Sequence, residues 1–130
     1  MSQARLVLVL TGALLVGAAA GTYATIQAAP PAYVLVVSGV PSDPASLGPY
    51  AEAAGPVALE AGLEGMASTA DVQVLAGEWP FEGRTVTLER FSLMRAPRDF
   101  WYSPEYQAAQ ELREGLVNVD FNIAVEGGSF

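Results

Sequence analysis

The chain contains no cysteine, no histidine and no lysine, and these absences exclude several kinds of chemistry. Without cysteine there is no disulfide, no thiolate nucleophile and no Cys-ligated zinc. Without histidine there is no Ser-His or Cys-His nucleophile pair, so acid–base work would need a carboxylate or a tyrosine with a displaced pKa. The sequence therefore favours a non-catalytic protein without a metal or another cofactor, and it leaves enzymatic activity open.

Positive charge is also scarce in this chain of 130 residues. All six basic residues are arginines, against 14 acidic residues, and the net charge is −8. A net-acidic chain without a basic stripe is repelled by a phosphate backbone, so we expect no nucleic-acid partner. The length suffices for one hydrophobic core and not for two.

The N-terminal segment is the most apolar part of the chain. Its one charge, Arg5, is followed by an uncharged run that lasts until Asp43. As a helix, residues 6–26 would span about 31 Å, close to the thickness of a bilayer's hydrocarbon core. Residues 1–27 are thus either a secretory signal peptide, cleaved at the small residues near its end, or a retained transmembrane anchor. Their length favours the anchor.

Small residues recur every four positions in this segment, at Ala13, Gly17 and Gly21. Such a face lets a second membrane helix approach closely, although Ala-rich signal segments show the same spacing by chance. Arg5 lies on the short N-terminal side of the apolar segment, so the positive-inside tendency keeps the N-terminus cytoplasmic. We expect a single-pass protein of the cytoplasmic membrane with its domain on the periplasmic or extracellular side, or else a protein secreted to the periplasm.

The rest of the chain predicts one domain at residues 33–127, between a proline-containing spacer at 28–32 and a tail at 128–130. Alternating or continuous apolar residues predict strands at 32–40, 71–78, 84–93 and 119–127, and helical periodicity predicts helices at 45–61 and about 96–116, with a loop at 62–69. The order β-α-β-β-α-β predicts an α+β, ferredoxin-like sandwich with an antiparallel sheet.

Two helix starts and one apolar stripe can be predicted from single residues. Ser42 or Asp43 can cap the first helix before Pro44, and Pro56 should kink or interrupt that helix. Ser103 can cap the later helix before Pro104, where Glu105 meets the positive end of the helix dipole. The stripe expected to pack on the sheet consists of Tyr106, Ala109, Leu112 and Leu116, and Gly115 fits a C-terminal stop.

The segment FWYSPEYQAAQELR, after a strand that ends in RFSL, resembles the signature of a small bacterial family known as domain of unknown function 1330. The residues that match are Phe91, Trp101, Ser103, Pro104, Glu105, Tyr106, Gln107 and Arg113. The resemblance covers about residues 32–126. It implies a ferredoxin-like fold of the dimeric α/β-barrel kind, in which two sheets pack face to face, and it implies no reaction. Arg90 stands where many members have a glutamate, so an acid–base role of that glutamate does not transfer.

Two groups of residues are candidates for a binding surface. With helices on one sheet face, the other must meet solvent or a partner. We expect that face to carry Gln73, Glu89, Asp120 and Asn122, either as a wet cleft between two protomers or as a solvated surface. The aromatic residues Trp79, Phe81, Trp101 and Tyr102 form either a docking surface or lids over the core.

Two functions from different classes follow. The first is a membrane-anchored, non-catalytic accessory subunit of a larger bacterial membrane complex, such as a respiratory or photosynthetic one. The alternative is a secreted or tethered homodimer that binds or converts a small ligand.

Overall fold

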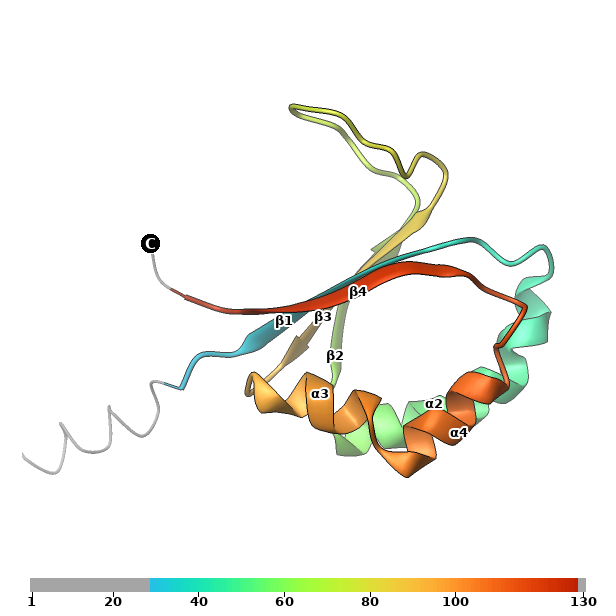
Figure 1. The fold of residues 1–130 in the computed structure, drawn as a ribbon, viewed down its shortest axis with the longest axis vertical. Coiled ribbons are helices and arrows are strands. Elements are labelled where there is room, and N and C mark those ends of the chain that lie inside the picture. Colours follow the sequence, from blue (N-terminus) through green and yellow to red (C-terminus); the bar gives the residue numbers. More distant parts are fainter. Residues whose placement is uncertain (1–28, 129–130) are drawn as a thin grey trace, which may run out of the picture.

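The protein is described here by a computed structural model that covers residues 29–128. Its elements are β1 (Ala32–Ser38), the 3-10 helix η1 (Pro44–Leu47), α2 (Gly48–Glu60), β2 (Glu64–Thr69), β3 (Thr85–Phe91), α3 (Arg95–Trp101), α4 (Pro104–Glu111) and β4 (Val119–Glu126). The helices form a layer on one side of a four-stranded sheet (Figure 1). The expected α+β, ferredoxin-like arrangement is therefore confirmed.

The sheet has the strand order β2-β3-β1-β4, and every neighbouring pair is antiparallel. The central strand β1 is flanked on both sides, with Val34 opposite Glu89 of β3 and Ala124 of β4. Its apolar, β-branched residues suit a strand with neighbours on both edges. In β4 the pairing shifts between the partners of Val37 and Ser38, which marks a bulge near the start of that strand.

The prediction of the second strand is wrong. Residues 71–78 alternate in the pattern of a strand, yet they form no strand, and β2 consists of Glu64–Thr69, inside the predicted loop. The reason is the length of the neighbouring strand β3. This strand begins at Thr85, and its ladder with β2 ends at the pair of Thr69 and Val86. The chain beyond Thr69 has no strand to pair with. Residues 70–84 instead form a projecting loop, here called the arm, on the side of the sheet away from the helices (Figure 1).

The predicted helix starts are correct, and the lengths of both helical regions differ from expectation. The side chain of Asp43 accepts a hydrogen bond from the backbone N–H of Ala45 at 3.1 Å, and the chain turns through η1 into α2. Pro56 lies inside α2 without interrupting it. The second region is two helices, because Ser103 ends the turn after α3 and caps α4.

The core lies between the sheet and the helices and is small. Its buried hydrophobic side chains are Ala32, Val34, Ala54, Phe91, Tyr106 and Ala109, and Val37 is buried on the opposite face of the sheet. Tyr106 and Ala109 are buried as predicted, whereas Leu112 and Leu116 are exposed, because α4 ends at Glu111 before their turn is reached. Gly115 has a φ of 77°, which suits its expected place after the helix.

The expected membrane segment, residues 1–27, lies outside the described residues. Across residues 29–128, none of the helices combines the length and the apolar composition that crossing a bilayer requires.

Candidate functional site: a cleft between the sheet and the helices

A cleft of about 890 Å³ lies between the sheet and the helical layer. Its floor is one face of the sheet, made by alternate residues of β1, β3 and β4, and its walls come from α2, α3, α4 and the segment after α4. Among the side chains that line it are Glu89, Asn122, Tyr50, Tyr106, Trp101, Arg98 and Arg113. The volume falls within the range of roughly 300–1,000 Å³ that is typical of small-molecule sites.

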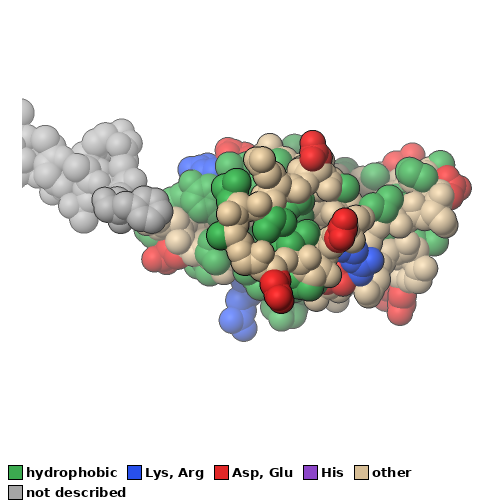
Figure 2. Space-filling model, turned by 90° about the horizontal axis from the view of Figure 1, so that it is seen from above, with side chains coloured by type: hydrophobic (Ala, Val, Ile, Leu, Met, Phe, Trp, Pro, Cys, Tyr) green, Lys and Arg blue, Asp and Glu red, His purple; other side chains and the backbone are tan. Residues whose placement is uncertain are grey.

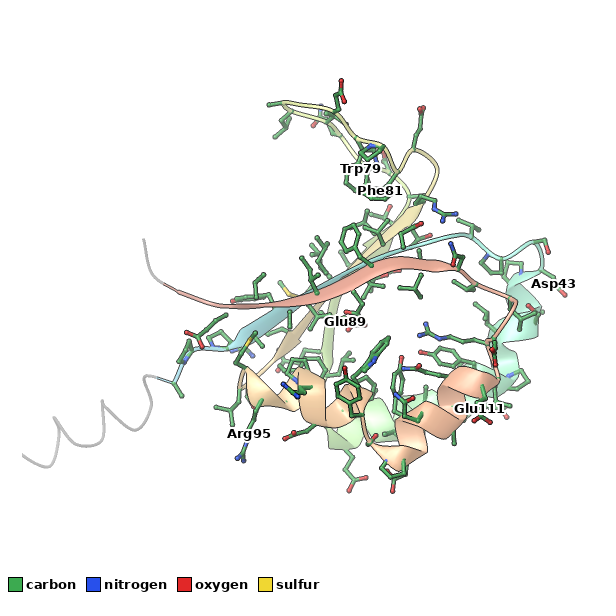
Figure 3. All side chains as sticks on the ribbon, viewed as in Figure 1. Asp43, Trp79, Phe81, Glu89, Arg95 and Glu111 are labelled. Atoms are coloured by element: carbon green, nitrogen blue, oxygen red, sulfur yellow. The ribbon has the colours of Figure 1, made fainter. Side chains whose placement is uncertain are left out.

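Glu89 places a carboxyl group on the floor of this cleft. It belongs to β3, and Figure 3 shows it on the side of the sheet that faces the helices. The residue is half-buried, and burial raises the pKa of its carboxyl above the usual value. Across residues 29–128 the ion pairs join Arg84 to Asp120 and Arg90 to Glu64, so neither neutralises Glu89. Its carboxyl is therefore available to a ligand.

Two tyrosines and an arginine form a polar group on the helical wall. The hydroxyls of Tyr50 in α2 and Tyr106 in α4 share a hydrogen bond of 2.9 Å. The guanidinium of Arg113 lies 5.1 Å from the centre of the Tyr50 ring, a cation–π distance. Burial, the hydrogen bond to Tyr50 and the charge of Glu89 raise the pKa of Tyr106, while the charge of Arg113 acts to lower it. Tyr106 thus stays a neutral phenol between an acidic and a basic group.

Aromatic rings cover much of the remaining wall. The ring of Phe100 lies 4.1 Å from that of Tyr106 and 5.9 Å from that of Phe91, and Trp101 lies 5.6 Å from Tyr106. The cap by Ser103 fixes this arrangement, because it starts α4 within a turn of the end of α3. Flat, apolar walls with a few convergent polar groups are the usual composition of a site for a small organic molecule.

The cleft unites two of the four residues that were expected to form a ligand surface. Glu89 and Asn122 both line it, although the expected face was the one away from the helices. Gln73 lies on the exposed arm. Asp120 lies at the bulge of β4, where the alternation of sides is interrupted, and it accepts two hydrogen bonds from Arg84 at 2.8 and 2.6 Å.

The four aromatic residues expected at a docking surface lie in two separate places. Trp101 and Tyr102 line the cleft. Trp79 and Phe81 lie on the opposite side of the sheet (Figure 3), where Phe81 packs edge-on against Phe121 at a centroid distance of 5.4 Å. They attach the base of the arm to β4. The expected membrane-helix face at Ala13, Gly17 and Gly21 lies outside the described residues.

The sheet face away from the helices, here called the outer face, is apolar rather than polar. By strand alternation it carries Tyr33, Leu35, Val37, Val86, Leu88, Phe121, Ile123 and Val125, of which Val37 is fully buried, and at one end the ion pair of Arg90 with Glu64. The prediction that polar side chains occupy the face away from the helices is therefore wrong. Ile123 is 46% exposed and Val125 is 52% exposed. Seen from the side to which the arm projects, hydrophobic side chains lie among acidic and other polar ones (Figure 2).

Sequence reasoning missed Tyr50, Arg98 and Arg113 as parts of the site. Tyr50 and Arg113 are 63 positions apart, and only the packing of α2 against α4 brings them together. One signal was present in the sequence, because Arg113 belongs to the family signature although it follows the last turn of α4. Within residues 29–128 no three acidic side chains are grouped so as to hold a metal ion.

Replacing Glu89 with glutamine is expected to stabilise the protein above neutral pH. Because burial raises the pKa of this carboxyl, its ionised form costs the folded state free energy. That cost is absent below the carboxyl's unfolded-state pKa and grows as the pH rises through the folded-state pKa. Glu89→Gln should therefore raise the free energy of unfolding at about pH 8, by less than about 1 kcal/mol since the group keeps contact with water, and should have no such effect at about pH 3.5.

Thermal unfolding of the variant and of the wild type at both pH values measures this difference. The matched control is Glu111→Gln, because Glu111 is an exposed glutamate of α4. A variant that is no more stable than the wild type at high pH would contradict the assignment of Glu89 as a desolvated carboxyl.

Comparison with known proteins supports the fold and names no activity. Residues 31–127 match the family described as "Domain of unknown function (DUF1330)". Among solved structures, the RPA0582 protein of unknown function from Rhodopseudomonas palustris superimposes with a TM-score of 0.53 at 16% identity, over 85% of this chain and 92% of that one. The methylated RPA0582 protein gives a TM-score of 0.54 at 15% identity, over 85% of this chain and 90% of that one.

A Caulobacter crescentus protein, proposed to be an antibiotic biosynthesis monooxygenase, is more distant. It gives a TM-score of 0.43 at 14% identity, over 83% of this chain and 99% of that one. This similarity is too low to indicate a shared function. No curated protein matches the chain.

Proposed function

Since the chain belongs to the DUF1330 family, whose description assigns no activity, we propose its function from the cleft: the protein binds a small organic ligand with a flat ring between its sheet and its helices. The observation that carries this proposal is a half-buried carboxyl, Glu89, which faces an aromatic-walled cleft without an ion-pair partner among the described residues. Leaving such a group unneutralised costs stability, and functional sites are where such costs are usually found.

The cleft suits binding, and it also contains a group that can exchange a proton. Glu89 with its raised pKa can accept or donate a proton, and the hydrogen-bonded pair of Tyr50 and Tyr106 can orient a polar group of the ligand. A proton-transfer reaction on the bound ligand is thus within reach of this site. The proposal itself requires only binding.

The active form is proposed to be a homodimer joined through the outer face. An antiparallel sheet with one free face normally presents polar side chains to water, and here the exposed part of the outer face around Leu88, Ile123 and Val125 is apolar. A two-fold dimer would cover the same patch on both subunits. Because the cleft lies on the other face of the sheet, this dimer leaves it accessible. In this dimer the cleft lies inside each protomer, whereas the sequence left open a cleft between two protomers or a solvated face.

Binding of 2-naphthol tests the proposed function. Calorimetric titration of the full-length protein should show saturable binding, and Trp101→Ala should weaken it about tenfold because a ring of the cleft wall is lost. Trp79→Ala is the matched control, because Trp79 lies on the other side of the sheet. The proposal fails if neither 2-naphthol nor a naphthalene compound with another polar group binds, or if the two substitutions weaken binding equally.

The role of an accessory subunit in a membrane complex stays a prediction, because it depends on residues 1–27. If the segment is a retained anchor, intact-mass measurement of the mature protein should give the full-length mass. Loss of about 24–28 N-terminal residues would instead show that it is a cleaved signal peptide.

A further inference from the structure

The arginines of this acidic chain are distributed unevenly between the cleft and the rest of the described surface. Arg84 and Arg90 pair with Asp120 and Glu64 outside the cleft. Two of the other arginines, Arg98 and Arg113, line the cleft, and no described carboxylate forms an ion pair with either. The cleft therefore has two guanidinium groups and one carboxyl, a local excess of positive charge in a protein of net charge −8.

Arg113 is the better placed of the two to bind an anion. Its residue is half-buried, and its guanidinium is held against the ring of Tyr50, beside the hydroxyl pair of Tyr50 and Tyr106. Stacking on an aromatic ring leaves the N–H groups at the edge of the guanidinium free to donate two parallel hydrogen bonds to a carboxylate. Arg98 is exposed and lies 5.9 Å from the centre of the Tyr102 ring, so it adds to the positive field.

We propose that the ligand of the cleft is a small aromatic carboxylate whose carboxylate group is bound by Arg113 and whose ring lies against Trp101 and Tyr106. This inference rests on the proposed function and adds the chemical class of the ligand. A single negative charge fits because one half-buried guanidinium matches one carboxylate in bidentate geometry. A doubly charged phosphate would be repelled more strongly by Glu89 on the floor of the same cleft.

The test compares 2-naphthoate with 2-naphthamide, a neutral compound of nearly the same shape, by calorimetric titration of the full-length protein near neutral pH. We expect 2-naphthoate to bind at least about tenfold more tightly, as a charge-assisted bidentate pair predicts. Arg113→Gln should reduce its affinity to that of the amide, and Arg113→Lys should retain part of the advantage. Arg95→Gln is the matched control, because Arg95 is exposed and points away from the sheet (Figure 3).

The outcomes separate the two proposals. Equal affinity for the carboxylate and the amide, or a carboxylate advantage that survives Arg113→Gln in a variant with unchanged circular dichroism, would overturn the inference and leave the proposed function standing. If 2-naphthol, 2-naphthoate and 2-naphthamide all fail to bind, the proposed function is overturned as well. An equal loss of affinity in Arg95→Gln would show a general effect of net charge and would also overturn the inference.

Discussion

Phe91→Ala is expected to lower the free energy of unfolding by about 3–5 kcal/mol, the usual cost of removing a buried aromatic side chain. Phe91 is 1% exposed and is one of the two largest fully buried side chains among the described residues. It packs with Ala32 and Val34 and lies against the ring of Phe100, so it joins the end of β3 to the helical layer. A core this small has few other contacts to replace it.

Denaturant unfolding followed by circular dichroism measures this effect. Leu75→Ala is the control, because Leu75 is 87% exposed on the arm and its loss should change stability by no more than about 0.5 kcal/mol. Because Phe91 also lines the cleft, water entering the space left by the ring would bring the cost toward the lower end of the range. A loss below about 1 kcal/mol would contradict the position of Phe91 in the core.

Ile123→Asp is expected to convert the proposed homodimer into a folded monomer. Ile123 lies on the edge strand β4 within the outer face, where Leu35 is its neighbour on β1 and Leu88 follows on β3. A two-fold interface would bury the new carboxylate twice without a partner, at several kcal/mol in total. We therefore expect the dimer dissociation constant to rise by at least about a thousandfold.

Analytical ultracentrifugation at micromolar concentration measures this change, with circular dichroism as the check on folding. Leu59→Asp is the matched control, because Leu59 is 78% exposed on α2, away from the outer face. If the wild type is itself monomeric at these concentrations, the proposed homodimer is wrong. If Ile123→Asp stays dimeric while it remains folded, the interface lies elsewhere.

The two faces of the sheet divide the proposed roles of the protein. The helix side combines a polar group with aromatic walls and is suited to a ligand, whereas the outer side is apolar and suited to a second copy. Glu89 and Ile123 illustrate the division. The carboxyl of Glu89 would cost free energy in a dry interface, whereas the aliphatic side chain of Ile123 would be of little use in a ligand site. Substitutions on one face are therefore expected to leave the function of the other intact.

Strand alternation alone could not have assigned these faces. It correctly separates Glu89 and Asn122 from Phe121 and Ile123, but it does not say which set the helices cover. The usual assumption that the apolar set is covered fails here, because a partner rather than a helix is proposed to cover it. The same limit applies to residues 71–78, whose pattern fits a strand but which have no neighbouring strand to pair with.

The sequence by itself determined the order of the elements and the starts of the helices. The caps at Asp43 and Ser103 follow from hydrogen bonds between residues two or three positions apart, so no distant contact is needed to form them. Only the tertiary structure decided the register of β2, the face that the helices cover and the meeting of Glu89 with Arg113 in one cleft. Each of these depends on contacts between residues far apart in the chain, and a local pattern cannot specify them.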